Sequence, residues 1–245
     1  MKIIQLTDLH IDSNGDATMG IDVRQNYLDA LQKIRREENP DHLVITGDLC
    51  HTRGDRSVYE WVKDRTDLIG VPIHVLNGNH DEVTALSEVF GCDRLMIEGE
   101  LYYHRIWNDL DALFLDTGKG YVSEAQMLWV DGKLQNSRRE VVIFMHHPPL
   151  NGGVQFMEKN YPLRNREAFA QLLFSCPNPL TVFCGHYHAA VTVQQENVTM
   201  HIAPSTFYQI KSQPDDFEMD HHNPGYRVIH FEENGIRSEV RFVRT

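Results

Sequence analysis

Five short apolar segments of this chain each run directly into residue types that bind metal ions in proteins. They are Ile3–Leu6 before Asp8 and His10, Leu43–Ile45 before Asp48, Ile73–Leu76 before Asn79 and His80, Val141–Phe144 before His146 and His147, and Leu180–Cys184 before His186 and His188. In open α/β sheets the carboxyl ends of neighbouring parallel strands line one crevice. Side chains that lie far apart in the sequence are therefore expected to converge on one site.

Helix-like amphipathic segments separate these strands, so the chain alternates between the two element types. The expected helices span residues 27–34, 58–68, 82–90, 124–134 and 167–174, a sixth buried strand spans 112–115, and the C-terminal strands span 191–193, 201–203, 227–231 and 238–242. Alternating strands and helices favour partly parallel sheets with helices packed outside them. The sequence therefore predicts an α/β fold with two sheets face to face.

The domain organisation follows from length and from what the sequence lacks. A chain of 245 residues, 41% of them hydrophobic, can bury a substantial core. No internal repeat or long Pro/Gly/Ser linker divides it, although residues 211–223 are polar and acidic and predict a loop. We therefore expect a single domain over residues 1–245.

Charge and hydrophobicity exclude several classes of partner. The 23 Lys and Arg against 35 Asp and Glu leave a net charge of -12, which argues against a protein that tracks long nucleic acids. No apolar run is long enough for a membrane helix, and Asp8 comes too early for a signal peptide. The four cysteines form no Cys-x-x-Cys pair and are expected to be reduced thiols. These features predict a cytoplasmic protein without a membrane partner.

Each ligand cluster also has an ordinary structural explanation when it is taken alone. Asp8 and His10 would point to one side of an extended segment, but such pairs also occur on surfaces and in caps. An isolated residue such as Asp48 is usually a turn residue. Gly78–Asp81 offers an amide oxygen, an imidazole and an acid, and Gly185–His188 offers two imidazoles, which could be packing histidines. Together, the clusters outweigh these alternatives and predict a metal site.

The order of the motifs resembles that of a known family. Asp-x-His, Gly-Asp, Gly-Asn-His-Asp, His-His-Pro-Pro and Gly-His-x-His follow one another between Asp8 and His188, as in the calcineurin-like metallophosphoesterases. The segments 161–165, 203–206 and 224–227 are similar to those of bacterial class III cyclic-AMP phosphodiesterases. The resemblance implies a four-layer αββα sandwich in which helices flank two mixed β-sheets.

The resemblance also implies a ligand set for two metal ions. It assigns Asp8, His10, Asp48 and His188 to the first ion and Asp48, Asn79, His146 and His186 to the second, so that Asp48 bridges both. These nitrogen and oxygen ligands, without a thiolate, suit Mn²⁺, Fe²⁺/Fe³⁺, Co²⁺ or Zn²⁺. Two such ions can hold phosphate oxygens and lower the pKa of a bound water.

The implied reaction is attack of a metal-bound hydroxide on phosphorus. In the family the counterpart of His80 faces the substrate, so we expect His80 to contact the phosphate and protonate the leaving oxygen, with Asp81 orienting it. The alternative for His80 is a structural histidine beside the ligands. Adjacent residues at a strand end point apart, so His147 is expected to be structural if His146 binds metal.

The substrate contacts are less sharply defined by the sequence. Residues 150–166 could form a cap over the metals, in which Arg164 and Asn165 would bind a phosphate or stack on a base. The alternative for Arg164 is a solvated arginine at a helix start. His221 and His222 lie in the acidic loop, where a surface pair competes with an approach to the site or to a partner subunit.

The resemblance leads to a specific expectation for function. We expect a phosphodiesterase that opens 3′,5′-cyclic AMP to 5′-AMP, and a homodimer is compatible with the family. One alternative is a broader phosphodiesterase acting on glycerophosphodiesters, 2′,3′-cyclic nucleotides or aryl diesters. A non-catalytic scaffold with the same fold is a further alternative, which the presence of all seven expected ligands disfavours.

Overall fold

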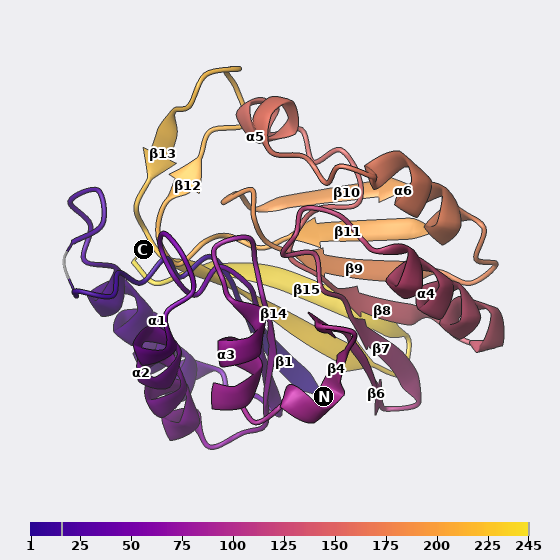
Figure 1. Cartoon of the computed structure of the whole chain (residues 1–245), viewed down its shortest axis with the longest axis horizontal. Helices are drawn as coiled ribbons and strands as arrows, with labels where there is room; N and C mark the ends of the chain where they lie inside the picture. The colour runs from indigo at the N-terminus through magenta and orange to yellow at the C-terminus, as the bar shows by residue number, and fades with distance from the viewer. Residues whose placement is uncertain (16, 245) are drawn as a thin grey trace.

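Two mixed β-sheets form the centre of the computed structural model, which describes residues 1–15 and 17–244 (Figure 1). The first sheet has the order β15-β14-β1-β2-β3, with β15 (Gly235–Phe242), β14 (Gly225–Glu232), β1 (Lys2–Leu6), β2 (His42–Thr46) and β3 (Ile73–Leu76). The second has the order β10-β11-β9-β8-β7-β6, with β10 (Val191–Gln195), β11 (Val198–Ile202), β9 (Leu180–Cys184), β8 (Val141–Phe144), β7 (Leu110–Phe114) and β6 (Tyr103–Trp107).

Parallel strands occupy the middle of each sheet. β1, β2 and β3 pair in parallel, and β14 and β15 extend that sheet antiparallel. In the second sheet β7, β8, β9 and β11 are parallel, with β6 and β10 antiparallel at the edges. The five strands that precede the ligand clusters are thus all parallel strands, divided between two sheets.

The two faces of the second sheet pack against different layers. Phe114, Phe144 and Phe183 project from neighbouring strands into the core shared with the first sheet, where successive ring centroids are 5.0 and 5.4 Å apart. The residues before them, such as Leu113 and Ile143, belong to a second core. Because both faces are covered, these strands read in the sequence as continuous apolar runs.

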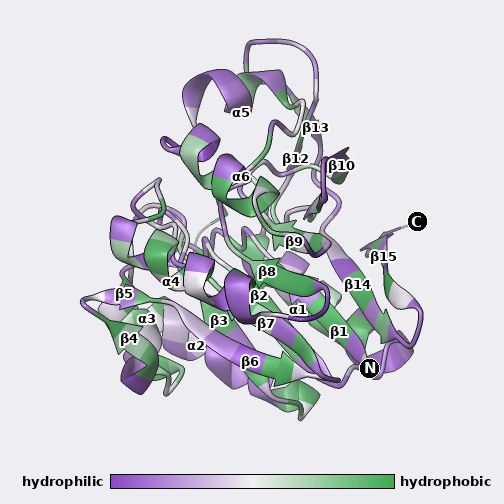
Figure 2. Ribbon diagram, turned by 90° about the vertical axis from the view of Figure 1, so that its right-hand side faces the viewer, coloured by the Kyte–Doolittle hydropathy of each residue, from purple (hydrophilic) through white to green (hydrophobic). Residues whose placement is uncertain are grey.

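Helices cover the outer face of each sheet, as the resemblance implies. α1 (Val23–Glu37), α2 (Arg56–Thr66) and α3 (Val83–Val89) lie beside the first sheet, and α4 (Glu124–Asn136) and α6 (Arg166–Phe174) beside the second (Figure 1). The inner strands β8 and β9 are largely hydrophobic, whereas the outward side of α4 carries hydrophilic residues (Figure 2). The expected four-layer sandwich is confirmed.

Several short elements were not expected from the sequence. These are α5 (Gln155–Asn160), β4 (Met96–Ile97), β5 (Glu100–Leu101), the edge strand β6, the hairpin strands β12 (Gln209–Ile210) and β13 (Met219–His221), and 3₁₀ turns at Asp67–Ile69 and Asp93–Leu95. Most are too short to show a hydrophobic period. Within the part of the chain that the structure describes, no helix is both long and apolar enough to cross a bilayer.

Candidate metal centre

The expected ligands occupy tight turns rather than extended chain. β1 ends at Leu6, and both Asp8 and His10 have left-handed backbone conformations, with φ of 54° and 46°. Asp48, His186 and His188 also have positive φ. Non-glycine residues rarely adopt this conformation, and such strain clusters at functional sites. Asp8 and His10 therefore reach one site because the chain curls after the strand, not because an extended strand alternates.

Glycines let the ligand loops pack closely. Gly47 has φ of 99°, and a Cβ added there would lie 2.6 Å from both the Gly78 nitrogen and the His146 Nδ1. A Cβ on Gly78 would collide with the Asp48 carboxylate. A larger residue at either position would push apart the loops that follow β2, β3 and β8. These glycines are thus needed for the site geometry.

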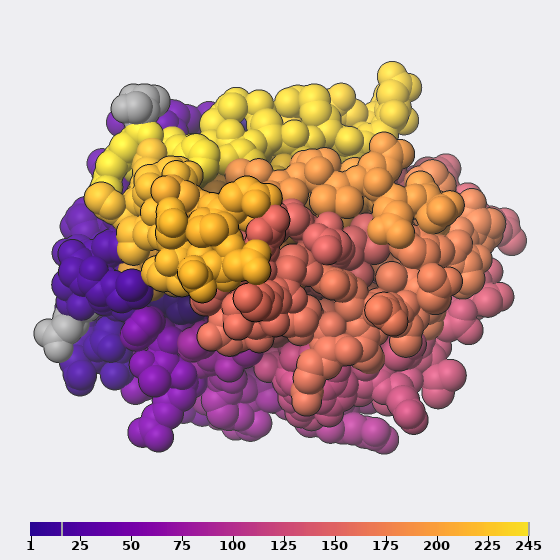
Figure 3. Space-filling model, turned by 90° about the horizontal axis from the view of Figure 1, so that it is seen from above, coloured from indigo at the N-terminus to yellow at the C-terminus, as the bar shows by residue number. Residues whose placement is uncertain are grey.

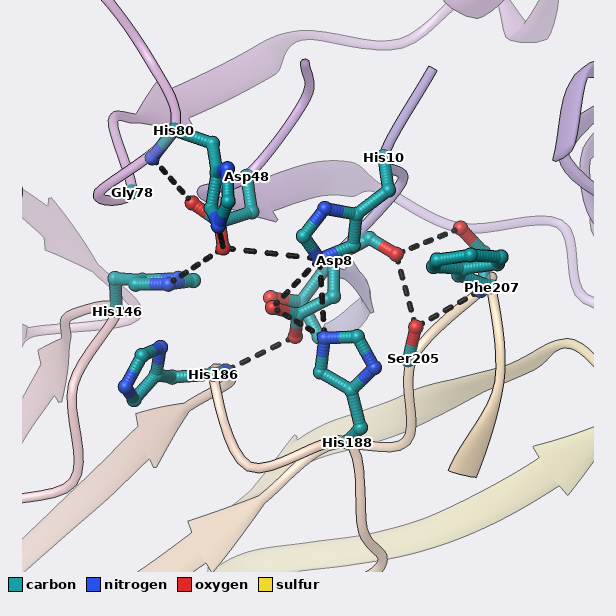
Figure 4. A network of polar contacts seen from close by, with 12 residues as sticks. Asp8, His10, Asp48, Gly78, His80, His146, His186, His188, Ser205 and Phe207 are labelled. Carbon is teal, nitrogen blue, oxygen red and sulfur yellow. Dashed lines mark hydrogen bonds and ion pairs between the residues drawn. The ribbon is translucent and has the colours of Figure 1, made fainter. Parts of the chain in front are cut away.

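One group of donor atoms forms where β1 of the first sheet meets β9 of the second (Figure 4). The Asp8, His10 and His188 side chains each offer a ligand atom, and these atoms all lie within 4.8 Å of one another. The His188 Nε2 lies 3.0 Å from the His10 Nε2 and 3.4 Å from the Asp8 Oδ1. Such spacing allows all three to contact one ion.

A second group lies beside the first. Asp48, His146 and His186 offer ligand atoms within 4.8 Å of one another, and the His146 Nε2 is 3.3 Å from the Asp48 Oδ2. The same Asp48 oxygen is 3.7 Å from the His10 Nε2 of the first group. The Asp48 carboxylate therefore lies between the two groups.

Backbone carbonyls orient the imidazoles. In each case one ring nitrogen lies at hydrogen-bond distance from a carbonyl oxygen, so it carries the proton and the other nitrogen has a free lone pair. The contacts are the His146 Nδ1 to the Thr46 oxygen at 2.7 Å, the His186 Nε2 to the Tyr161 oxygen at 3.0 Å, and the His188 Nδ1 to the Tyr208 oxygen at 3.1 Å. The remaining nitrogens are thereby prepared for metal binding.

Buried atoms without partners support a cation at this site. The Asp8 Oδ1 and the His146 Nε2 are buried and have no hydrogen-bond partner among the described residues, which is costly unless an ion binds there. Burial would raise the pKa of Asp8, but His188 and His146 outweigh it and lower that pKa to about 2. Burial lowers the pKa of His10 to about 3. Burial would also lower the pKa of His146, but Asp48 outweighs it and raises that pKa to about 9, so a metal ion has to displace a proton from His146. Anionic carboxylates and neutral imidazoles are the forms that bind metal.

The donor groups face a cavity of about 540 Å³, a size suited to a small-molecule ligand. Its lining is His10, Met19, Asp48, Asn79, His80, Phe156, Met157, Tyr161, His186, His188, Tyr208, Ile210 and Phe217. No Lys, Arg or Cys is among these residues. An anionic ligand in the cavity would therefore meet no side-chain cation of fixed charge.

The loop after β3 places its polar residues differently. Asn79 is exposed and lines the cavity, as does His80, whose backbone N–H donates to the Asp48 Oδ1 at 3.0 Å. The Asp81 carboxylate accepts from the backbone N–H groups of Leu49 and Gly78. It also accepts from the Cys50 N–H and the Tyr59 hydroxyl. The expectation that Asp81 orients the His80 imidazole is corrected, because its oxygens bind the loop backbone instead.

Arg164 and Asn165 do not reach the cavity, which corrects their expected role in substrate binding. The Arg164 guanidinium donates to the carbonyls of Lys119 and Gly120 and covers the Tyr121 ring. The Asn165 amide pairs with the backbone of Val122 through both its oxygen and its nitrogen. Both residues fasten the start of α6 to the loop before α4.

The remaining histidines of interest have structural surroundings. His147 is buried, its Nδ1 lies 3.0 Å from the Thr117 hydroxyl, and its ring packs on His186 with centroids 4.1 Å apart. His221 accepts from the Asn223 N–H through its Nδ1. His222 lines a separate surface cavity. None of the three is among the residues that line the cavity at the donor groups.

An aromatic side of the cavity was missed by sequence reasoning. We call Phe156, Tyr161, Tyr208 and Phe217 the aromatic wall; they come from α5 and its C-terminal neighbour and from the hairpin segment around β12 and β13. Phe156 and Tyr161 lie in the segment 150–166, which was expected as a cap, and Phe217 lies in the expected loop 211–223, but no aromatic contact was predicted for them. No local pattern links the four, because the two chain segments are more than forty residues apart.

The fold and the two donor groups define a metal-binding α/β protein of the four-layer sandwich class. The family model described as calcineurin-like phosphoesterase matches residues 1–190, so the chain belongs to that family. The chain is therefore a metal-dependent phosphoesterase by fold, by family and by the ligand types that it brings together.

Three named relatives match almost the whole chain. A probable cyclic nucleotide phosphodiesterase of Fibrobacter succinogenes is 31% identical, over 100% of this chain and 95% of its own length. A 3′,5′-cyclic adenosine monophosphate phosphodiesterase of Vibrio vulnificus is 26% identical, over 98% and 89%. A probable glycerophosphodiester phosphodiesterase of Arcobacter nitrofigilis is 26% identical, over 99% and 93%. All three are named as phosphodiesterases.

A solved structure shares the fold. A dimetal phosphatase from Danio rerio superposes with a TM-score of 0.74 at 15% sequence identity, over 99% of this chain and 96% of that one. At this identity the likeness establishes the architecture.

Proposed function

We propose that this chain hydrolyses 3′,5′-cyclic AMP to 5′-AMP at a site that holds two metal ions. The observation that carries the proposal is the position of the Asp48 Oδ2, which is 3.3 Å from the His146 Nε2 and 3.7 Å from the His10 Nε2. A carboxylate between two donor groups can bridge two ions. The proposed ligands are Asp8, His10, Asp48 and His188 for one ion, and Asp48, Asn79, His146 and His186 for the other.

The charge of the cavity supports metal dependence. Two ions bound here would polarise the phosphoryl oxygens and lower the pKa of a water that attacks phosphorus. The nitrogen and oxygen donors suit Mn²⁺, Fe²⁺/Fe³⁺, Co²⁺ or Zn²⁺. A phosphodiester is anionic, and the lining offers one aspartate, Asp48, but neither Lys nor Arg. The substrate charge is therefore to be balanced by the ions.

His80 is the residue proposed to move a proton. Its side chain is about one-third exposed, and its Nε2 is 3.9 Å from the Asp48 Oδ2, beside the donor groups. The attacking water would lose one proton to solvent and become hydroxide. As the hydroxide oxygen bonds to phosphorus, the bond from phosphorus to the 3′ oxygen breaks, and the His80 imidazole donates a proton to that oxygen. Asn79, at the same edge, would also bind the phosphate.

The relatives support the choice of substrate and also a second candidate. The Fibrobacter and Vibrio relatives are named for cyclic nucleotides. The Arcobacter relative, named for glycerophosphodiesters, matches as much of the chain. The second candidate is therefore a broad phosphodiesterase that accepts glycerophosphodiesters, 2′,3′-cyclic nucleotides or aryl diesters.

A comparative kinetic assay tests the proposal. Metal-reconstituted protein would be given 3′,5′-cyclic AMP, 2′,3′-cyclic AMP, an aryl diester and a glycerophosphodiester, with Asn79→Ala as the control for contaminating enzymes. Release of 5′-AMP by the wild type, with the highest kcat/KM of the four, supports the leading function. A cyclic-AMP rate orders of magnitude below the others selects the broad phosphodiesterase. A protein that binds no stoichiometric metal after reconstitution would indicate a scaffold.

A further inference from the structure

We infer that the aromatic wall is a binding site for the nucleobase of the substrate, and this inference rests on the proposed function. Phe156, Tyr161, Tyr208 and Phe217 line the same cavity as the metal-ligand side chains His10, Asp48, His186 and His188. Aromatic faces stack on nucleobases because every base has a planar π face. The aromatic wall would then determine which phosphodiesters the protein prefers.

Exposed apolar side chains gather at this cavity. Eight large hydrophobic residues of the described chain are exposed, and Met19, Tyr161 and Phe217 line the cavity. Tyr161 is 53% exposed and Phe217 is 37% exposed. Concentrated apolar exposure beside a polar site is typical of a binding surface.

The rings of the wall meet edge to face. The Phe217 ring meets those of Phe156 and Tyr208 edge to face, with centroids 5.5 and 5.7 Å apart and interplanar angles of 64° and 79°. The Phe156 and Tyr161 rings also meet edge to face, at 63°. No two wall rings are stacked face to face, and Tyr161 and Phe217 are exposed, so a flat group can reach a ring of the wall.

The wall is joined to the metal-ligand side chains through its own backbone. The His186 Nε2 is 3.0 Å from the Tyr161 carbonyl oxygen, and the His188 Nδ1 is 3.1 Å from that of Tyr208. Two wall residues thus orient two expected metal ligands. A phosphate at the ions and a flat group on the wall would therefore be held at a set separation, as a nucleotide requires.

The two arms of the wall are fastened to each other. The Gln155 N–H, at the start of α5, donates to the Ser212 carbonyl in the hairpin at 3.1 Å, and Lys159 pairs with Asp215 at 3.3 Å. Seen from above, the gold hairpin lies against the salmon α5 segment (Figure 3). The wall is therefore one surface rather than two independent loops.

The closing experiment compares ligands that share a phosphate and differ in the base. Metal-loaded wild type should bind 5′-AMP roughly tenfold or more tightly than ribose 5-phosphate in calorimetric titrations. The Phe156→Leu/Phe217→Leu double variant should bind the two about equally. Phe174→Leu, which changes a half-buried phenylalanine on α6, is the matched control. This variant should still bind 5′-AMP more tightly than ribose 5-phosphate.

Kinetics give a second readout. In the double variant kcat/KM for 3′,5′-cyclic AMP should fall roughly tenfold, mainly through KM, while a glycerophosphodiester changes less than about twofold. Equal losses on both substrates, or a wild type that binds 5′-AMP no better than ribose 5-phosphate, would overturn the inference. If the wild type cleaves no diester, the proposed function fails, and the titrations still decide the role of the wall.

Discussion

The cavity has two sides that are built in different ways. On the metal-ligand side, six of the seven proposed metal ligands lie at the junction of the two sheets and are at most 6% exposed, whereas Asn79 is exposed at the edge of the cavity; the six are Asp8, His10, Asp48, His146, His186 and His188. The aromatic wall stands on a six-residue helix and a short hairpin, and two of its residues, Tyr161 and Phe217, are 53% and 37% exposed.

The difference separates chemistry from selectivity. Each buried ligand is held by strained backbone, by carbonyl acceptors or by close glycine contacts, so a change there disturbs its neighbours. Phe156 and Tyr208 also pack on the hydrophobic core, but Tyr161 and Phe217 lie at the surface and can be exchanged with little effect on the fold. We therefore expect the reaction rate to depend on the metal-ligand side and the choice of substrate to depend on the aromatic wall.

The largest effect is expected from Asp48→Asn. The substitution keeps the shape but removes the charge that lies between the two donor groups. Bound metal should fall and kcat/KM should drop roughly 10³-fold on every diester, because both ions depend on this carboxylate. Metal analysis and steady-state kinetics measure this, with Asp216→Asn, an exposed hairpin aspartate, as control. Full metal loading with unchanged turnover would contradict the conclusion that the rate depends on the metal-ligand side of the cavity.

A smaller and substrate-dependent loss is expected from His80→Ala. The backbone N–H to Asp48 remains, so both ions should stay bound. Loss of the proton donor should lower the rate on cyclic AMP roughly 10²-fold, and less on aryl diesters with good leaving groups. If both substrate types lose rate equally, His80 positions phosphate and does not act as an acid.

Acid stability is expected to depend in part on His74, a half-buried histidine of β3 that lies away from the metal-ligand side chains. Burial, with His42 and Arg105, lowers the pKa of His74 to about 3. The unfolded chain therefore takes up this proton first, so stability is complete above about pH 6.5 and declines as pH falls, by roughly 2 kcal/mol at pH 5. Acid unfolding of His74→Leu, compared with the wild type, should lack this part of the decline. Parallel curves would mean that His74 is not responsible.

The smallest effect is expected from Arg164→Ala. The guanidinium binds two backbone carbonyls and a tyrosine ring away from the cavity. Both KM and kcat should change less than about twofold, and stability by about 0.5 kcal/mol. Kinetics and thermal unfolding test this. A tenfold rise in KM would restore the phosphate-binding role that the sequence suggested.

The sequence allowed the layers and the parallel strands to be predicted because their signals are local. Ile73–Leu76 and Leu180–Cys184 were predicted with the bounds that the structure has. Short elements such as α5 lacked a hydrophobic period. Leu28 shows the limit of hydrophobicity as a guide to burial, since this leucine of α1 is 37% exposed.

The roles of Asp81 and Arg164 could not be read from spacing. Asp81 stands next to His80 in the sequence, yet its carboxylate points to backbone N–H groups after β2. Arg164 follows a flexible segment, yet Lys119 and Gly120 supply its acceptors from a different loop. Both side chains thus form their hydrogen bonds with backbone groups of another loop, which their own neighbours in the sequence do not indicate.

The sequence by itself determined the fold class, the family and the residue types that gather at the strand ends. Strand formation and ligand chemistry depend on short runs of residues, so one chain is enough to recognise them. Only the tertiary structure decided which side chains form the aromatic wall, where Asp81 and Arg164 point, and which carbonyls orient the imidazoles. These depend on contacts between segments far apart in the chain, such as Gln155 with Ser212, which no local pattern records.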